Sequence, residues 1–261
     1  MRQFTRREVC SGVGLIASPC LLSSCLSEKI ISSPDKGKES DILWAYAPLD
    51  PDTTAERAYK YYYEGHCMYG VFKSIVSQLA ELKGQPYDSF PFYMMRYGAG
   101  GVAGWGSLCG GLNGGAAVTG LFTKTEEQRR LLIDELFRWY EKTELPLYVP
   151  KKAKLKMEMA RSISNSILCH TSVSKWCKAS GYRAFSNQHL ERCACLTADM
   201  AKMTVEILNS NFQRQFIAAH SLSEEAKTCN FCHAKGGERE DSVTKMNCSA
   251  CHLALGSGHG K

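Results

Sequence analysis

The stretch Cys229-Asn230-Phe231-Cys232-His233 recurs shortly afterwards as Cys248-Ser249-Ala250-Cys251-His252. Each copy reads C-x-x-C-H, the attachment signature of a c-type haem. Two thiols add across the two vinyl groups of one porphyrin, and the adjacent histidine becomes the proximal ligand of the iron. Disulfides or a zinc site of C-x-x-C knuckles are the alternative, but neither requires a histidine directly after the second cysteine. The sequence predicts two covalently bound haem c groups, held by Cys229, Cys232, Cys248 and Cys251, with His233 and His252 as proximal ligands.

The segment around these motifs, about forty residues from Leu222 to Lys261, has few large apolar side chains. A segment of this size normally needs a staple or a metal to fold, and two haems would supply the missing apolar bulk. It is also too short to cover two porphyrins, so the haems must dock on the rest of the chain or on another subunit. The linker at residues 234–247 is rich in Gly, Lys, Glu and Asp and reads as a loop that keeps the haems close together.

The chain has 261 residues, a net charge of +6 and 13 cysteines. This length fits one or two domains. The positive charge forms no long basic run and is not interleaved with aromatic residues, so nucleic-acid binding is not indicated. Four cysteines belong to the haem motifs and three to an N-terminal leader, which leaves Cys67, Cys109, Cys169, Cys177, Cys193 and Cys195.

The N-terminus reads as an export signal, because the pair Arg6-Arg7 precedes a weakly apolar run that ends near Leu22. The stretch Leu22-Ser23-Ser24-Cys25 resembles a lipoprotein cleavage box. Cys25 then either becomes a lipidated membrane anchor, or the leader is cleaved nearby and a soluble periplasmic protein results. We predict a twin-arginine signal over 1–25 and a tether over 26–50, which is rich in Ser, Pro, Lys, Asp and Gly.

The rest of the chain reads as all-α, and no alternating strand pattern of any length occurs. Apolar residues recur at steps of three and four from Thr53 to about Gly84, which predicts a helix. The run from Gly98 to Gly120 is glycine-rich, but no strand precedes it and no Gly-Lys-Ser/Thr ends it, so a phosphate loop is rejected. A small-residue helix from about Ser107 to Leu121 is favoured, packed very close to a neighbour and with Cys109 at its N-terminal end.

Three more helices and a connector follow. Thr125 caps a helix to about Lys142, with Leu131, Leu132, Leu136, Trp139 and Tyr140 directed inward. Two prolines mark residues 145–154 as a connector. Ser186 caps a helix to about Leu208, and a last short helix is expected from Phe212 to about Ser221. The predicted architecture is a helical, cysteine-rich redox domain over 51–215 and a loop-rich di-haem segment over 216–261.

The cysteines outside the haem motifs form a second candidate site. Cys67, Cys109, Cys169, Cys177 and Cys193 lie on different predicted elements, and four thiolates that converge would hold an iron–sulfur cluster or a zinc ion. Ordinary buried cysteines are the alternative. The twin-arginine route exports folded proteins, often loaded with a cofactor, whereas haem c is attached after export. We predict that four of the five converge and that Cys195 does not, because it points about 200° away from Cys193 on one helix.

A family resemblance supports this interpretation. The order Gly65-His66-Cys67-Met68-Tyr69-Gly70, Cys109-Gly110-Gly111, Cys169 and Cys193, followed by the twin haem motifs, resembles the split-Soret cytochromes c. The helical part is similar to a wider redox family named for its spaced GCAxxG and Cys pattern. This chain departs from that pattern at Met68, and it has His66 beside Cys67. The resemblance implies a di-haem, all-helical, intertwined homodimer with stacked haems, bis-His ligation and an additional iron–sulfur centre.

Each haem iron needs a sixth ligand or keeps an open site. We expect His170 and His220 as the first candidates and His259 as the third, with His66 and His189 as ordinary surface or core residues. The bis-His ligation that the resemblance implies predicts an electron carrier that meets redox partner proteins, because such irons have no open site for a substrate. The leader predicts that this carrier is exported to the periplasm. A reductase with an open haem or a reactive thiol pair is the alternative, and a metal-binding module without redox function is the third.

Overall fold

The computed structural model describes residues 43–250. The predicted export signal and most of the predicted tether lie outside this range, as do Cys25, Cys251, His252 and His259. Within it, no helix has the length and apolar character that a bilayer span requires.

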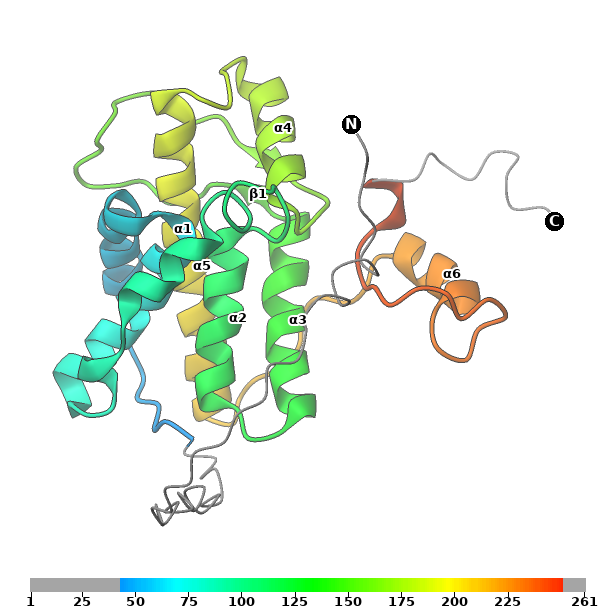
Figure 1. Ribbon diagram of the computed structural model, residues 1–261, viewed down its shortest axis with the longest axis horizontal. Coiled ribbons are helices and arrows are strands. Elements are labelled where there is room, and N and C mark those ends of the chain that lie inside the picture. Colours follow the sequence, from blue (N-terminus) through cyan, green and yellow to red (C-terminus); the bar gives the residue numbers. More distant parts are fainter. Residues whose placement is uncertain (1–42, 251–261) are drawn as a thin grey trace, which may run out of the picture. The chain divides into compact units, whose positions relative to one another are not determined.

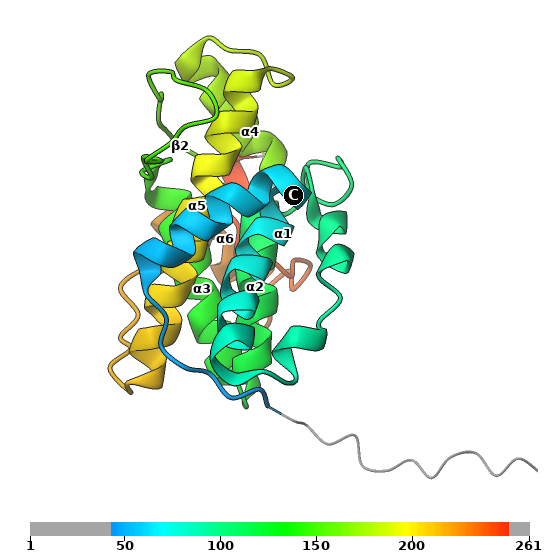
Figure 2. The same ribbon diagram turned by 90° about the vertical axis from the view of Figure 1, so that its left-hand side faces the viewer.

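Four long helices form the body of the described chain, and both ribbon views show them side by side (Figures 1 and 2). They are α1 (Pro51–Lys83), α2 (Gly110–Phe122), α3 (Glu126–Lys142) and α5 (Asn187–Phe212). Their shared core contains Phe72, Leu112, Leu136 and Met200, all fully buried. The only strands in residues 43–250 are β1 (Glu144–Leu145) and β2 (Ser162–Ile163), an antiparallel pair. The all-α fold is confirmed.

Two predicted helix starts are confirmed by their caps. The Thr125 hydroxyl accepts from the Gln128 amide at 3.1 Å, and that of Ser186 accepts from the His189 amide at 3.2 Å. Such caps satisfy amides that have no partner inside the helix. The expected inward position of Leu131 is wrong, because its side chain is 47% exposed while Leu132 next to it is buried.

The glycine-rich run divides into a loop and a tightly packed helix. Gly100, Gly101, Gly104 and Gly106 all have positive φ, which keeps residues 99–108 from entering the helix. α2 therefore begins at Gly110, with Cys109 at the N-cap. A Cβ on Gly114 would lie 2.8 Å from the Met68 carbonyl oxygen, so this glycine lets α2 approach α1 closely.

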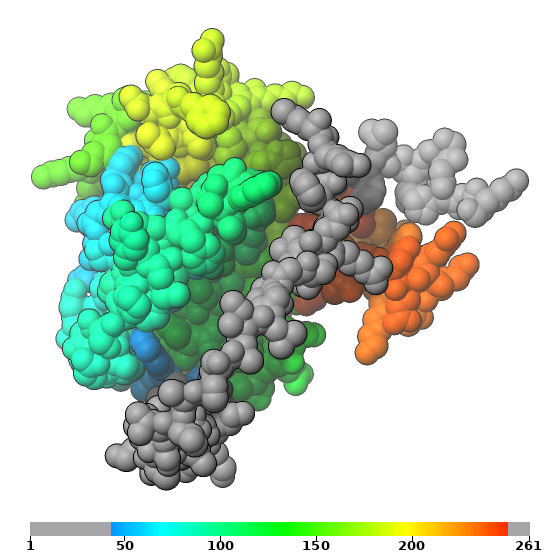
Figure 3. Space-filling view, viewed as in Figure 1, coloured from blue at the N-terminus to red at the C-terminus, as the bar shows by residue number. Residues whose placement is uncertain are grey.

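Two 3₁₀ helices, η1 (Tyr87–Ser89) and η2 (Phe92–Gly98), lead from α1 into this loop. The cyan-to-green surface in Figure 3 is formed by this part of the chain. Residues 84–108 expose four large apolar side chains: Tyr93, Met94, Tyr97 and Trp105.

α1 is interrupted directly before Cys67. Gly65 (φ −154°, ψ 16°) and His66 (φ 67°, ψ −167°) both leave helical geometry. The His66 conformation belongs to a region that is normally occupied only by glycine, and holding another residue there costs about 1–3 kcal/mol. The surrounding structure must stabilise this break.

We expect His66→Gly to raise the free energy of unfolding by about 1 kcal/mol, because the relief of backbone strain exceeds the entropy cost of a glycine. Lys60→Gly is the matched control, since Lys60 is also exposed on α1 but lies in a regular turn. Glycine there should lower stability by about 1 kcal/mol. Urea denaturation followed by circular dichroism measures both, and equal losses in the two variants would show that His66 is not strained.

The connector after α3 is held by one buried carboxylate, and a helix that the sequence did not predict follows it. Asp199 accepts from the backbone amides of Leu147 at 2.8 Å and Tyr148 at 2.9 Å. The following helix, α4 (Cys169–Ser180), has no side-chain cap at Leu168 and therefore lacks the usual sequence signal at its start.

The predicted tether and the predicted last helix both need correction. Residues 43–50 pack against the body: the Tyr46 hydroxyl donates to Asn209 Oδ1 at 2.8 Å, and Leu49 is buried. The helix expected at 212–221 is wrong, because α5 ends at Phe212. The Glu135 carboxylate on α3 accepts from the amides of Ala219 and His220, both at 3.0 Å, so these amides bond outside any helix.

The first haem motif lies instead on a helix of its own, α6 (Glu224–His233), which Ser223 caps. Residues 234–247 contain no helix or strand, as predicted, and η3 (Cys248–Ala250) begins the second motif. This segment is tied to α3, because Arg138 donates to the Lys245 carbonyl and Lys245 pairs with Asp134. The division into domains at residue 216 stays a prediction.

Candidate metal centre

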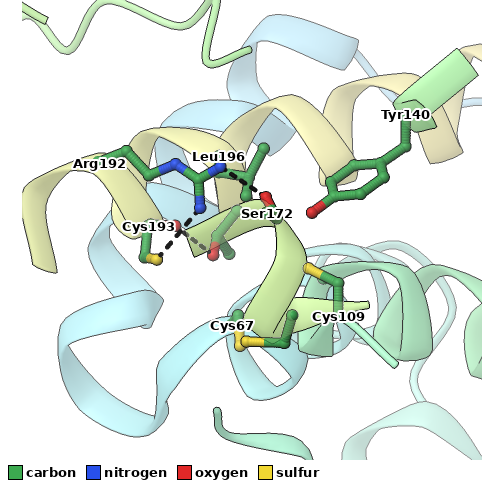
Figure 4. A pocket seen from close by; sticks show the side chains of 10 residues that line it. Cys67, Cys109, Tyr140, Ser172, Arg192, Cys193 and Leu196 are labelled. Carbon is green, nitrogen blue, oxygen red and sulfur yellow. Dashed lines mark hydrogen bonds between the residues drawn. The ribbon is translucent and has the colours of Figure 1, made fainter. Parts of the chain in front are cut away.

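Four cysteines from four helices line one small cavity (Figure 4). Cys67 comes from α1, Cys109 from the N-cap of α2, Cys169 from the first residue of α4 and Cys193 from α5. Cys177 and Cys195 do not line it. Cys195 is instead fully buried in a neighbouring apolar cluster. The structure thus brings together four of the six cysteines that the sequence left outside the leader and the haem motifs.

The backbone fixes Cys109 and Cys169 as neighbours. Leu108 and Leu168 form an antiparallel β-bridge. On either side of it, the Cys109 amide donates to the Ile167 carbonyl at 2.9 Å, and the Cys169 amide donates to the Ser107 carbonyl at 2.7 Å. These bonds place the starts of α2 and α4 side by side, so the N-cap of α2 and the first residue of α4 both present a cysteine to the cavity.

Glycines make room for the other contacts. A Cβ on Gly110 would lie 2.3 Å from the Cys67 sulfur, and one on Gly101 would lie 2.7 Å from the Cys169 Cβ. Real Cβ atoms do not approach so closely, so any side chain at either position would displace a cysteine. Two glycines of the run therefore make room for the cysteines of this cavity.

The thiols differ in how readily they ionise. Burial raises the pKa of Cys67, Cys109 and Cys169, that of Cys169 to about 12. For Cys67, the charges of the other three cysteines add to the effect of burial. Burial also acts to raise the pKa of Cys193, but hydrogen bonds and charge from His189 and Arg192 outweigh it and lower the pKa to about 7. Of the four cysteines, Cys193 therefore forms a thiolate most readily.

Two residues beside Cys193 were missed or misjudged from the sequence. His189 was expected to be an ordinary residue, but its Nε2 lies 3.3 Å from the Cys193 sulfur. Their separation of four residues on one helix face could have indicated this contact. Arg192 Nη1 donates to the same sulfur at 3.7 Å, and its Nη2 donates to Ser172 Oγ at 2.7 Å (Figure 4). Nothing in the sequence marks Arg192 as buried.

The donor set fits an iron–sulfur cluster in type and number, since four cysteine thiolates are its usual ligands. Within residues 43–250, no three His, Cys, Asp or Glu side chains stand close enough to ligate one metal ion. Cluster ligands bind different iron atoms and so stand farther apart than the ligands of a single zinc ion. The cavity has a volume of about 20 Å³, room for about one water molecule, so the thiols must move apart to admit a cluster.

Among the described residues, the side chains of the haem motifs and of His170 and His220 do not line this cavity. His233 Nδ1 lies 2.6 Å from Asp241 Oδ1, a contact that orients the ring. Burial and a hydrogen bond with Cys229 raise the pKa of Cys248, so the first cysteines of the two motifs are neighbours. The described residues of the first haem motif therefore lie close to those of the second.

The structure also places the other candidate histidines. His220 Nδ1 lies 2.6 Å from Glu135 Oε1 on α3, so a buried carboxylate holds its ring. His170 is exposed on the first turn of α4, beside Cys169, and its backbone amide donates to the Gly106 carbonyl at 3.1 Å. His66 is exposed as expected, with its ring edge-on to Tyr62.

Known proteins resemble this arrangement. Residues 66–207 match the family described as "Putative redox-active protein (C_GCAxxG_C_C)". The chain is 39% identical over 225 residues to the split-Soret cytochrome c of Desulfovibrio desulfuricans, covering 84% of this chain and 80% of that protein. A solved structure of that cytochrome, described as having a novel iron centre, matches with a TM-score of 0.77 over 81% of this chain and 90% of the other. The family pattern has a glycine directly before a cysteine, where this chain has the strained His66 before Cys67.

Proposed function

The chain belongs to the split-Soret cytochrome c family and is a cytochrome-like redox protein, and we propose that it is an exported electron carrier with two covalent haems and an iron–sulfur centre. The observation that carries the proposal is the pair of C-x-x-C-H motifs in a chain 39% identical to a cytochrome c over most of its length. Six-coordinate haem iron transfers single electrons and leaves no site for a substrate. The absorption spectrum with and without carbon monoxide tests this, because an open iron would bind the gas.

We propose His233 and His252 as the proximal haem ligands. On α6, the motif brings Cys229, Cys232 and His233 into one short helix, and Asp241 holds the His233 ring through Nδ1. That contact suits a metal-ligating histidine, which commonly bonds a carboxylate through its second nitrogen. Cys251 and His252 lie outside the described residues, so their role follows from the repeated motif.

His220 and His170 remain the proposed sixth ligands. His220 is the better supported, because Glu135 accepts at its Nδ1 and also holds the backbone of residues 219 and 220. Three hydrogen bonds to one buried carboxylate give this histidine a fixed position and orientation, which a metal ligand needs. His170 is exposed and could be reached by a second subunit.

The four cysteines of the cavity are the proposed ligands of the iron–sulfur centre. Their convergence from four helices, the buried Arg192 beside them and the novel iron centre of the split-Soret relative support this assignment. The twin-arginine pair Arg6-Arg7 fits a centre that is inserted before export, in a protein destined for the periplasm. A lipid on Cys25 would attach it to a membrane, and loss of a membrane fraction in Cys25→Ala would show this.

We propose that the protein is a homodimer with the haem regions of both subunits at or near the interface. The C-terminal segment is too small to cover two porphyrins, and bare porphyrin faces would form a large apolar patch. The segment also exposes Ile217, Phe231 and Val243, which a partner subunit could cover.

Sedimentation velocity of the purified protein should give the mass of a dimer. Val243→Glu should weaken the dimer, because it places a charge on an exposed apolar side chain of the haem segment. Val149→Glu is the matched control, since Val149 is also exposed but lies on the connector after α3. A stable monomer with both haems low-spin would refute the proposal.

A further inference from the structure

Arg192 is a buried cation at the cysteine cavity. Its side chain is only 2% exposed, and it is directed into the cavity from α5 (Figure 4). Nη1 donates to the Cys193 sulfur and Nη2 to Ser172 Oγ, while Nε is buried without a hydrogen-bond partner. Charged side chains are almost never buried unless an opposite charge accompanies them.

No carboxylate accompanies this one. None of the ion pairs within residues 43–250 includes Arg192. Arg138, the other deeply buried arginine of the described residues, pairs with Glu141 at 2.6 Å. The anions available to Arg192 are therefore the thiolates of the cavity, with Cys193 the nearest.

We propose that Arg192 is a positioning residue of this centre, which balances its negative charge through Cys193 and raises its reduction potential. This rests on the proposed iron–sulfur function. Net charge and hydrogen bonds to the sulfurs set the potential of such centres. On reduction, the centre gains one electron from a one-electron donor, here dithionite in a titration. Arg192 is already charged and takes up no proton, so its fixed positive charge favours the reduced state.

The test compares Arg192→Gln and Arg192→Met, which remove the charge, with Arg192→Lys, which keeps it. Gln retains a hydrogen-bonding group and Met retains apolar bulk, so the two variants remove the charge in different ways. Ser172→Ala removes the other partner of the guanidinium without changing any charge. A redox titration of the whole protein, followed by EPR, gives the midpoint potential of the non-haem centre, and the two haem potentials serve as internal controls.

We expect the Gln and Met variants to shift the reduction equilibrium at least tenfold toward the oxidised state, which is about 59 mV for one electron. Arg192→Lys and Ser172→Ala should remain within threefold of the wild type, and the haem potentials should not move. Loss of the non-haem iron from the Gln and Met variants but not from the Lys variant would support the same role.

The proposal alone would be overturned if the wild-type protein holds a non-haem centre and the potential of that centre is unchanged in the Gln and Met variants. Equal shifts in the Lys and Gln variants would also overturn it. Failure of both neutral variants to accumulate as folded, haem-containing protein would assign Arg192 a structural role and overturn it too. A wild-type protein without non-haem iron would contradict the proposed function itself, and the role of Arg192 with it.

Discussion

The double variant Cys229→Ala/Cys232→Ala should lose one of two covalent haems, because each C-x-x-C-H motif binds one porphyrin through its own two thiols. The denatured wild-type polypeptide should stain for haem on a gel and exceed its mature mass by two haems. The variant should exceed it by one. Pairing the loss with Cys248→Ala/Cys251→Ala should remove both haems.

Cys177→Ala is the control for this loss, since Cys177 lies on α4 outside both motifs and does not line the cysteine cavity. It should keep both haems.

Replacing Arg6 and Arg7 with Lys should retain the protein in the cytoplasm without haem, because haem c is attached after export. A wild-type chain with one haem or none would end the di-haem account, and full haem loading of the Lys variant would show that the export assignment is wrong.

Cys193→Ser should remove most of the iron in excess of the two haem irons and leave the haem content intact. Cys193 carries the thiol with the lowest pKa in the cavity, about 7, and metal ligands must be deprotonated. Serine is far less acidic than a thiol, so it cannot replace this thiolate. Cys109→Ser, at the N-cap of α2, should have the same effect. Iron, haem and zinc analysis of the purified protein measures the change.

Cys195→Ser is a closely matched control, because Cys195 is two residues from Cys193 on α5 and even more deeply buried. It lies in the neighbouring apolar cluster, and burial raises the pKa of its thiol to about 12. Its loss should affect stability and leave the non-haem iron unchanged. Equal amounts of non-haem iron in the Cys193 and Cys195 variants would show that the cysteines of the cavity only pack the core and bind no cluster.

Local sequence signals were sufficient wherever one element carries the whole pattern. The capped starts of α3 and α5 and the glycine-packed α2 each depend on a few consecutive residues. The prediction of a last helix at 212–221 was wrong because the amides of residues 219 and 220 donate to Glu135, more than eighty positions earlier in the chain. α4 was missed because Leu168 supplies no cap, and its start is set by a β-bridge to Leu108.

The cysteine cavity also depends on contacts between residues that are far apart in the sequence. The sequence could name five candidate cysteines, but it could not choose Cys169 over Cys177, which lie on the same helix. That choice is made by the tertiary bridge beside Cys109. Arg192 could not be found either, because an arginine on a long helix normally points to solvent. Only the packing of α4 and Tyr140 around it shows that it is buried.

The central claim, an electron carrier with two six-coordinate haems and a separate iron–sulfur centre, is tested most directly on the purified protein. The measurement is its absorption and EPR spectra, before and after carbon monoxide, with haem, iron and zinc quantified in the same sample. We predict two haems per chain, low-spin spectra that carbon monoxide does not change, iron in excess of haem and no stoichiometric zinc. A high-spin haem whose spectrum shifts with carbon monoxide would contradict the account and indicate a reductase with an open iron site.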